Sequence, residues 1–240
     1  MSNHHILDNI IHRDIRVINN SGIDLGDAQS YSKLYLSEVE QAQPCYPIFF
    51  RKNTHSGQFE MISLFGLAAR ENLYLDEKKW HASYIPLSIQ KGPFLIGYSE
   101  QNTEENSPVD PIVYIDMDSP RITTKKGESI FLTNGQPSAY LENISSILNS
   151  IHQNRTPTKN FIDTLLKNDL IESVKINIQL DDASDIELAN LYTIHQENVA
   201  NLRDSKLLQF HQQGYLKCVH FIHASMENMN SLIEKKNQRL

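Results

Sequence analysis

Residues 45–67, CYPIFFRKNTHSGQFEMISLFGL, decide the fold class of this chain. Two apolar runs, 45–50 and 59–67, flank the polar segment RKNTHSGQ, which carries Gly57. Two β-forming runs joined by a polar, glycine-containing connection are typical of an antiparallel hairpin. Further short β-type segments extend this pattern over the N-terminal half, at 15–18, 94–98, 113–117 and 129–132.

The hydrophobic period changes after the Asn134-Gly135 turn. Apolar residues then recur at helical spacing, which predicts an amphipathic helix of about four turns. They are Tyr140, Leu141, Ile144, Ile147, Leu148 and Ile151. The segment NRTP, residues 154–157, predicts the end of this helix, with Thr156 as the N-cap of a second one.

In residues 174–180 apolar and polar residues alternate strictly, which predicts a strand. Residues 186–194 are its expected hairpin partner. Further helices are expected over 199–212 and from Tyr215 onward. The sequence therefore predicts an α+β fold with an antiparallel β-rich N-terminal half and a helix-rich C-terminal half containing one hairpin. The expected boundary separates a β-rich region, 1–134, from a helix-rich region, 135–240, which are either two domains or two layers of one.

Charge and composition restrict the class of partner. The chain has 240 residues, 22 basic and 29 acidic, and a net charge of −7. An acidic excess argues against a nucleic acid as partner, because phosphates must be neutralised by Lys and Arg. The N-terminus lacks the features of a secretory signal, and no apolar run approaches the ~20 residues of a membrane helix. We therefore expect a cytoplasmic protein without a membrane span, and a mobile surface loop over the acidic segment 99–111.

Familiar catalytic signatures are missing from the sequence. There is no Gly-x-Gly pair for a phosphate loop, no Gly-x-Ser-x-Gly elbow, no His-Glu-x-x-His and no Cys-x-x-Cys. We therefore predict no cofactor, no metal and no catalytic residue, although many enzymes lack short motifs and the question of catalysis stays open.

The segment DMDSPR, residues 116–121, is the first candidate binding site. Asp116 and Asp118 stand two apart at the end of a predicted strand and share a side, so they could bind a cation or act as an acid–base pair. Arg121 could clamp an anionic ligand. The alternative is structural: Asp and Ser before a proline commonly end a strand, and Arg121 could neutralise one carboxylate.

An aromatic segment, residues 71–94, is the second candidate. It contains Trp80, the single tryptophan, together with Tyr84 and Phe94. Aromatic side chains bury large areas while Trp and Tyr keep a polar handle, so they line many pockets and interfaces. They also build ordinary cores, and the sequence does not decide between the two.

The last predicted helix offers two further alternatives. His220 and His223, three residues apart, could converge on a metal, whereas Cys218 points elsewhere on the helix. An apolar stripe on the same helix could pack in the core or form a homodimer; it comprises Val219, Ile222, Met226, Met229 and Ile233.

Three blocks of sequence resemble the SapC family, bacterial proteins named for surface-layer loci and often labelled as peptide-transport proteins. The blocks are 46–94, with its Glu71-Asn72-Leu73, Trp80 and Tyr84-Ile85-Pro86; IDMDSPRI with GESIF and GQPSAYLENI; and GYLKCVHFIHASMENMNSLIEKK. His81, Ser83 and Gly92 stand where the family pattern is more acidic or arginine-rich.

The resemblance implies a limited set of functions. The family has no established activity, cofactor or catalytic residue, so no residue role is carried over. Its members are encoded near outer-membrane receptors, halogenase-like flavoproteins and cupin-like proteins, which implies an accessory role in substrate uptake or modification. We therefore expect a non-enzymatic binding protein for an unknown protein or small-molecule ligand. The alternatives are a metal- or carboxylate-dependent enzyme and a structural homodimer.

Overall fold

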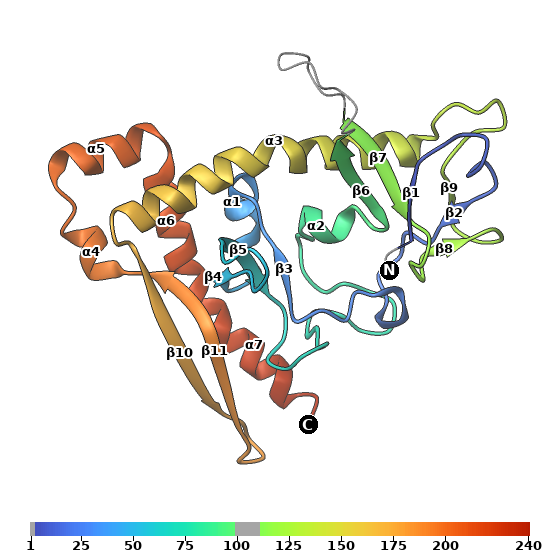
Figure 1. Cartoon of the computed structure of the whole chain (residues 1–240). Helices are drawn as coiled ribbons and strands as arrows, with labels where there is room; N and C mark the ends of the chain where they lie inside the picture. Colours follow the sequence, from blue (N-terminus) through green and yellow to red (C-terminus); the bar gives the residue numbers. More distant parts are fainter. Residues whose placement is uncertain (1–2, 99–110) are drawn as a thin grey trace.

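The computed structural model describes residues 3–98 and 111–240 (Figure 1). The predicted mobile loop at 99–111 falls almost wholly outside these residues. The largest sheet has five antiparallel strands in the order β10-β11-β4-β5-β3. Its strands are β3 (Tyr31–Lys33), β4 (Ile48–Lys52), β5 (Phe59–Leu64), β10 (Ile171–Gln179) and β11 (Asp185–Ile194).

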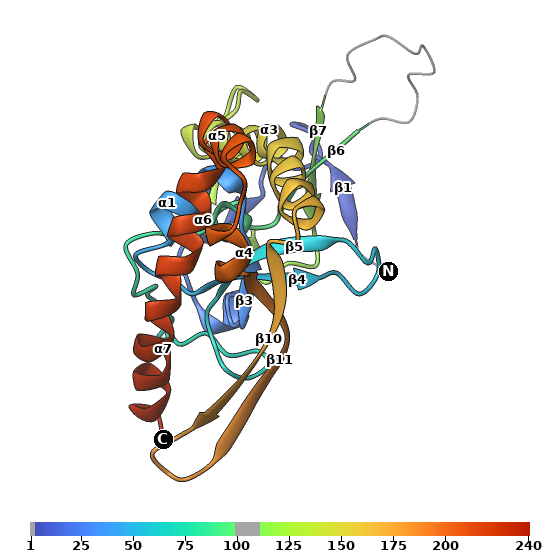
Figure 2. The same ribbon diagram turned by 90° about the vertical axis from the view of Figure 1, so that its left-hand side faces the viewer.

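The hairpin predicted from residues 45–67 is confirmed as β4 and β5. Its connection is fixed locally, because the Asn53 Oδ1 atom accepts hydrogen bonds from the backbone N–H groups of His55 and Ser56. Gly57 then takes the left-handed conformation at φ +67°, which favours glycine. The predicted β10–β11 hairpin is confirmed as well and extends beside the last helix (Figures 1 and 2).

Two small antiparallel sheets form the other end of the molecule. One has the order β1-β7-β6 and the other the order β8-β2-β9. Their strands are β1 (His4–Ile6), β2 (Arg16–Val17), β6 (Phe94–Tyr98), β7 (Pro111–Asp116), β8 (Ile122–Thr123) and β9 (Glu128–Ser129). Short helical turns occupy the connections: η1 (Ile23–Leu25), η2 (Leu36–Glu38), α1 (Val39–Ala42) and α2 (Leu87–Gln90).

One long helix joins the two ends. Helix α3 (Ala139–Lys167) has 29 residues and is therefore about 44 Å long. The predicted break at residues 154–157 is wrong, because Pro157 lies inside α3. A proline removes one backbone hydrogen bond, whereas packing holds the helix on both sides of it. Thr158, one residue later, also ties the helix to η2 by accepting a hydrogen bond from the Leu36 N–H at 2.9 Å.

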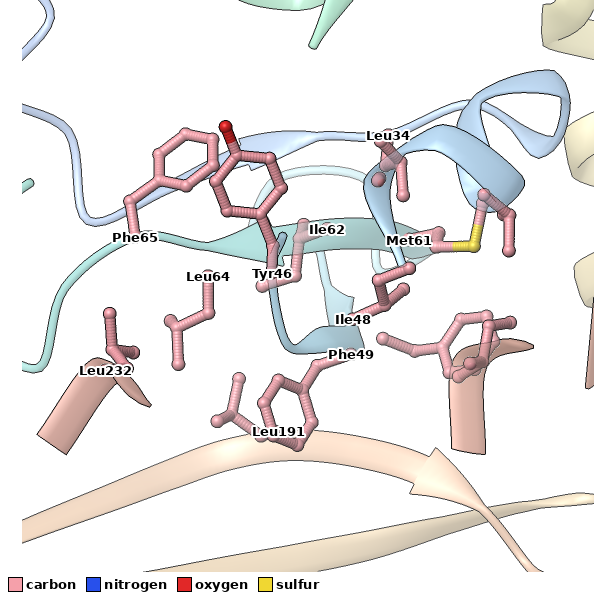
Figure 3. Close-up of a cluster of buried hydrophobic side chains, with 14 of the residues drawn as sticks. Leu34, Tyr46, Ile48, Phe49, Met61, Ile62, Leu64, Phe65, Leu191 and Leu232 are labelled. Atoms are coloured by element: carbon pink, nitrogen blue, oxygen red, sulfur yellow. The ribbon is translucent and has the colours of Figure 1, made fainter. Parts of the chain in front are cut away.

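Buried side chains form two hydrophobic clusters, and α3 contributes to both. The small-sheet cluster comprises Ile15, Val17, Tyr35, Phe94, Ile115, Ile130, Phe131, Leu141, Ile144, Ile147, Leu148 and Ile151. The large-sheet cluster surrounds β4 and β5, and Figure 3 shows part of it, from Leu34 to Leu232. It includes Phe161, Ile162 and Leu165 from the C-terminal half of α3. Each cluster takes residues from both sides of residue 134; whether 1–134 and 135–240 behave as separate domains stays a prediction.

The C-terminal helices cover the large sheet. The single helix expected over 199–212 is two, α4 (Gln196–Ala200) and α5 (Asp204–Gln212), and Gly214 ends α5 at φ +72° as predicted. The last helix is interrupted by η3 (Ser225–Glu227) between α6 (Tyr215–Ala224) and α7 (Asn228–Asn237). The predicted stripe packs against the large-sheet cluster, with Val219 and Ile222 fully buried.

Helix α7 also fixes a distant loop. The Lys236 Nζ atom lies 2.7 Å from the Glu71 Oε1 atom, and both side chains are about one fifth exposed. Past the end of the helix, the Arg239 guanidinium donates hydrogen bonds to the carbonyls of Asn72, Leu73 and Leu75. These contacts hold the segment that leads to Trp80.

The continuity of α3 can be tested with Pro157→Ala. We expect the free energy of unfolding to rise by about 1–3 kcal/mol, because alanine restores an N–H for the carbonyl of Gln153 and favours the helix interior. Urea denaturation measures the change, and Thr156→Ala, which adds no hydrogen bond, should change stability by about 0.5 kcal/mol or less. If a helix instead began at Thr156, Pro157 would favour its first turn and its removal would lower stability.

Candidate functional site

The predicted site residues do not form one surface. Trp80 and Phe94 are 6% and 0% exposed and belong to different clusters, the large-sheet and the small-sheet cluster respectively. The structure therefore gives both rings a place in a core. Tyr84 and Arg121, in contrast, line the same cavity between the two clusters. Ligand contact by any of these residues stays a prediction.

The cavity between the two clusters, here called the seam cavity, has a volume of about 390 Å³, within the usual range for small-molecule sites. It lies where the 83–92 segment meets the N-terminal half of α3. Apolar walls come from both clusters, since Ile144 and Ile147 belong to the small-sheet cluster and Ile85 and Ile89 pack against the large-sheet one. The cavity is lined by Asn19, Ser21, Ser83, Tyr84, Ile85, Ile89, Gln90, Gly92, Arg121, Tyr140, Asn143, Ile144 and Ile147.

Arg121 lines the seam cavity, and its buried positive charge is paired with a carboxylate. Its Nη2 atom lies 2.6 Å from both carboxylate oxygens of Asp27, and both side chains are at most a tenth exposed. Its Nη1 atom donates to the carbonyls of Ile18 and Asn20, at 2.9 and 2.8 Å. Asp27 in turn accepts a hydrogen bond from the N–H of Gly22. The charge of the arginine is thus neutralised within the protein.

Tyr84 is held in the cavity wall by a buried carboxylate. Its hydroxyl donates to the Glu38 Oε1 atom at 2.7 Å, which also accepts from the N–H of Leu87 at 2.8 Å, while Oε2 accepts from the N–H of Tyr35. Burial raises the pKa of Glu38, although these three donors oppose the shift. Burial and the neighbouring carboxylate also raise the pKa of Tyr84, so its phenol stays protonated.

A hydrogen-bonded chain connects this wall to Trp80. The indole N–H donates to the Tyr46 hydroxyl at 2.7 Å, and that hydroxyl donates to the carbonyl of Tyr84. Edge contacts with Phe65 fix both rings, with centroids 5.1 Å from Trp80 and 5.0 Å from Tyr46 (Figure 3 shows Tyr46 beside Phe65). Trp80 thus supports the cavity wall from behind through Tyr46.

The remaining polar groups of the cavity are uncharged. Within residues 3–98 and 111–240, the side chains of Asn19, Ser21, Tyr140 and Asn143 have no hydrogen-bond partner in the protein. Burial raises the pKa of Tyr140 to about 12, with the charge of Arg121 opposing the shift. Its hydroxyl is therefore a neutral donor and acceptor at pH 7. The described lining therefore offers hydrogen bonds to a ligand, and its one charged side chain, Arg121, is paired with Asp27.

Asp116 is the last residue of β7 and Asp118 stands two residues after it, and neither side chain lines the seam cavity. The Asp116 Oδ1 atom accepts from the N–H of Asp118 at 3.1 Å, and Asn3 donates to the Asp118 side chain at 3.2 Å. These contacts shape the turn after the strand. In the described part of the chain, no group of three or more His, Cys, Asp or Glu side chains could hold a metal, and His220 and His223 are exposed.

Sequence reasoning missed Asp27, Glu38, Tyr140 and Asn143. Asp27 has no local signal, because its partner Arg121 is 94 positions away. For Glu38 a weak signal existed, since it stands three residues after Tyr35, in the spacing of a capping box. Tyr140 was noted only as part of the apolar face of a helix.

The comparisons with known proteins identify a family and no nearer relative. The family model described as SapC matches residues 7–232, which confirms the resemblance noted in the sequence. No curated protein and no solved structure matches the chain. None of the helices in residues 3–98 and 111–240 is long and apolar enough to span a bilayer.

The buried ion pair can be tested with Asp27→Asn. We expect the free energy of unfolding to fall by about 3–5 kcal/mol, because Arg121 would stay buried without a counter-charge. Urea denaturation measures the loss. The matched control is Glu187→Gln, which breaks the exposed Lys175–Glu187 pair (2.7 Å) and should cost about 1 kcal/mol or less. Equal small losses would show that Asp27 does not compensate a buried charge.

The Glu38 contacts lead to a pH prediction for Glu38→Gln. At pH 7 the variant should lose about 1–3 kcal/mol, because its single carbonyl cannot accept all three donors. The raised pKa means that the folded state binds more protons than the unfolded one above the ordinary value of 4.5. The contribution of Glu38 to stability therefore grows as the pH falls from neutral towards 4.5. The difference in the free energy of unfolding between wild type and Glu38→Gln should widen over the same range.

Denaturation at several pH values between 7 and 4.5 measures this difference. Glu40→Gln is the control, since Glu40 is exposed and pairs with Lys217 at the surface; its loss at pH 7 should be about 1 kcal/mol or less. A difference for Glu38→Gln that narrows on acidification would contradict the raised pKa.

Proposed function

Because the chain belongs to the SapC family, whose biochemical function is unknown, we propose a function from the seam cavity: non-enzymatic binding of a small, uncharged, hydroxyl- or amide-bearing molecule. The observation that carries this proposal is the combination of a neutralised Arg121 with unpartnered neutral polar groups. Ser21 and Tyr140 are half-buried and Asn19 and Asn143 are exposed, so their polar atoms are accessible to a ligand that can take up their hydrogen bonds. A charged ligand bound among them would lose water without gaining a counter-charge.

The shape of the cavity supports the same class of ligand. Isoleucines from the 83–92 segment and from α3 supply apolar contact on two sides, while Tyr140 and Asn143, one turn apart on α3, offer hydrogen bonds from the same helix. A ring or short chain with hydroxyl or amide groups on one edge fits this cavity, because its apolar faces can contact the isoleucines while its polar edge faces Tyr140 and Asn143. We further propose that the protein binds this ligand as an accessory to proteins of substrate uptake or to halogenase-like proteins, the role that the family resemblance implies.

Binding is favoured over catalysis by the state of the titratable groups in the cavity. A general acid or base works best when its pKa lies near the operating pH. The lining phenols, Tyr84 and Tyr140, have pKa values raised well above neutrality, and Arg121 is compensated. These groups suit recognition of a ligand better than proton transfer.

The proposal can be tested by ligand-observed NMR with a panel of neutral polyols, monosaccharides and amides. For a binder found in the panel, Tyr140→Phe and Asn143→Leu should each weaken binding by about 3–10-fold, the effect of one lost hydrogen bond. Asn149→Leu is the matched control, because Asn149 is exposed on the same helix, as Asn143 is, but does not line the cavity. It should leave the affinity unchanged.

Two results would contradict the proposed binding site. If charged analogues of the same molecules bind as well as the neutral ones, the charge argument is wrong. If both cavity variants bind like Asn149→Leu, the ligand lies elsewhere.

A further inference from the structure

A second cavity lies between α3 and the large sheet, next to residues 155–166 of the helix, whereas the seam cavity borders residues 140–147. This α3–β5 groove has a volume of about 510 Å³. One wall is the C-terminal half of α3, and the other consists of β3, residue 35 and residues 57–61. Both ribbon views place this half of α3 next to β4 and β5 (Figures 1 and 2).

The floor of the groove is apolar. Tyr35, Met61 and Ile162 line it and are at most 5% exposed, and Phe59 lies partly buried at its side. Leu166, in contrast, is 38% exposed although it is a large aliphatic side chain on the groove wall. An aliphatic group that covered Leu166 and the floor would remove apolar surface from water, which is favourable.

Of the charged side chains that the structure places along the groove, one cation has no ion-pair partner. Lys33 pairs with Glu60 at 3.0 Å, and Lys159 pairs with Asp163 at 2.5 Å. Arg155 stands one turn before Lys159, is exposed and has no ion-pair partner among the residues that the structure describes. The groove residues that the structure describes therefore carry a net charge of +1, in a protein whose overall net charge is −7.

From this combination we propose that the α3–β5 groove binds an amphipathic monoanion, a carboxylate with an unbranched aliphatic tail. The guanidinium of Arg155 pairs with the carboxylate, since its planar fork matches the two carboxylate oxygens. The tail lies over Met61 and Ile162, and a tail of about twelve carbons spans the ~16 Å of helix between Arg155 and Leu166. A single uncompensated cation favours a head group with one negative charge, and the apolar floor requires the tail.

This site is independent of the seam cavity, whose lining favours neutral ligands. Among the residues that the structure describes, the two cavities share no lining residue. A change in one site therefore provides a control for the other, and the failure of one proposal does not affect the other.

The experiment is isothermal titration of the whole chain with octanoate, with 1-octanol and octylammonium as head-group controls. Octanoate should bind at least tenfold more tightly than 1-octanol, and octylammonium more weakly than both. Across hexanoate, octanoate and dodecanoate, the affinity should rise by about threefold per methylene, in proportion to the apolar surface buried.

Two variants test the assigned residues. Arg155→Gln should weaken octanoate binding about tenfold and leave 1-octanol unchanged, because a charge-assisted hydrogen bond is lost. Leu166→Asn should reduce the gain in affinity from octanoate to dodecanoate and leave octanoate binding nearly unchanged. Lys167→Gln is the charge-matched control on the same helix, since Lys167 does not line the groove, and Asn143→Leu is the control for the seam cavity.

The proposal is overturned if folded wild-type protein does not bind octanoate, or if it binds 1-octanol equally well. It is also overturned if Arg155→Gln and Lys167→Gln reduce the affinity by the same factor, because the effect would then be one of general charge. Circular dichroism of each variant confirms that the helices are retained.

Discussion

The packing of one helix in two hydrophobic clusters is the constraint on which the structure depends. Leu141 to Ile151 of α3 pack with the small sheets, and Phe161 to Leu165 pack with the large one. Each cluster includes residues from its own half of α3, and the helix runs without a break through Pro157 between them. Both cavities border this helix, the seam cavity on its N-terminal half and the α3–β5 groove on its C-terminal half.

Buried charges give the junction between the clusters its shape. Asp27 and Arg121 come from the N-terminal loop and from the segment before β8, and their pairing holds those segments together. Glu38 fixes the 84–87 segment through the hydroxyl of Tyr84 and the N–H of Leu87. Such groups are costly to bury unless every partner is present. Their complete pairing makes the cavity walls rigid, while the neutral side chains of Tyr140 and Asn143 are left available.

Local patterns in the sequence predicted local structure well. The β4–β5 and β10–β11 hairpins follow from alternation and turn residues, and the family follows from the blocks around Trp80 and Tyr84. The predicted break at 154–157 was wrong because a local rule for proline does not include tertiary packing at both ends of a helix. The pairing of Asp27 with Arg121 could not be predicted, since nothing near either residue indicates the other. The burial of Trp80 was likewise undecided, because an aromatic residue has the same local sequence in a core as at a surface.

The contacts of Arg239 have a consequence for how the chain folds during synthesis. The guanidinium holds the carbonyls of Asn72, Leu73 and Leu75, residues made more than 160 positions earlier. On a ribosome, the segment that leads to Trp80 must therefore wait until nearly all of these 240 residues have emerged before its final contacts can form. Until then those three carbonyls lack their guanidinium donor, and earlier contacts such as the hydrogen bond from the Leu73 N–H to the Phe65 carbonyl hold the segment.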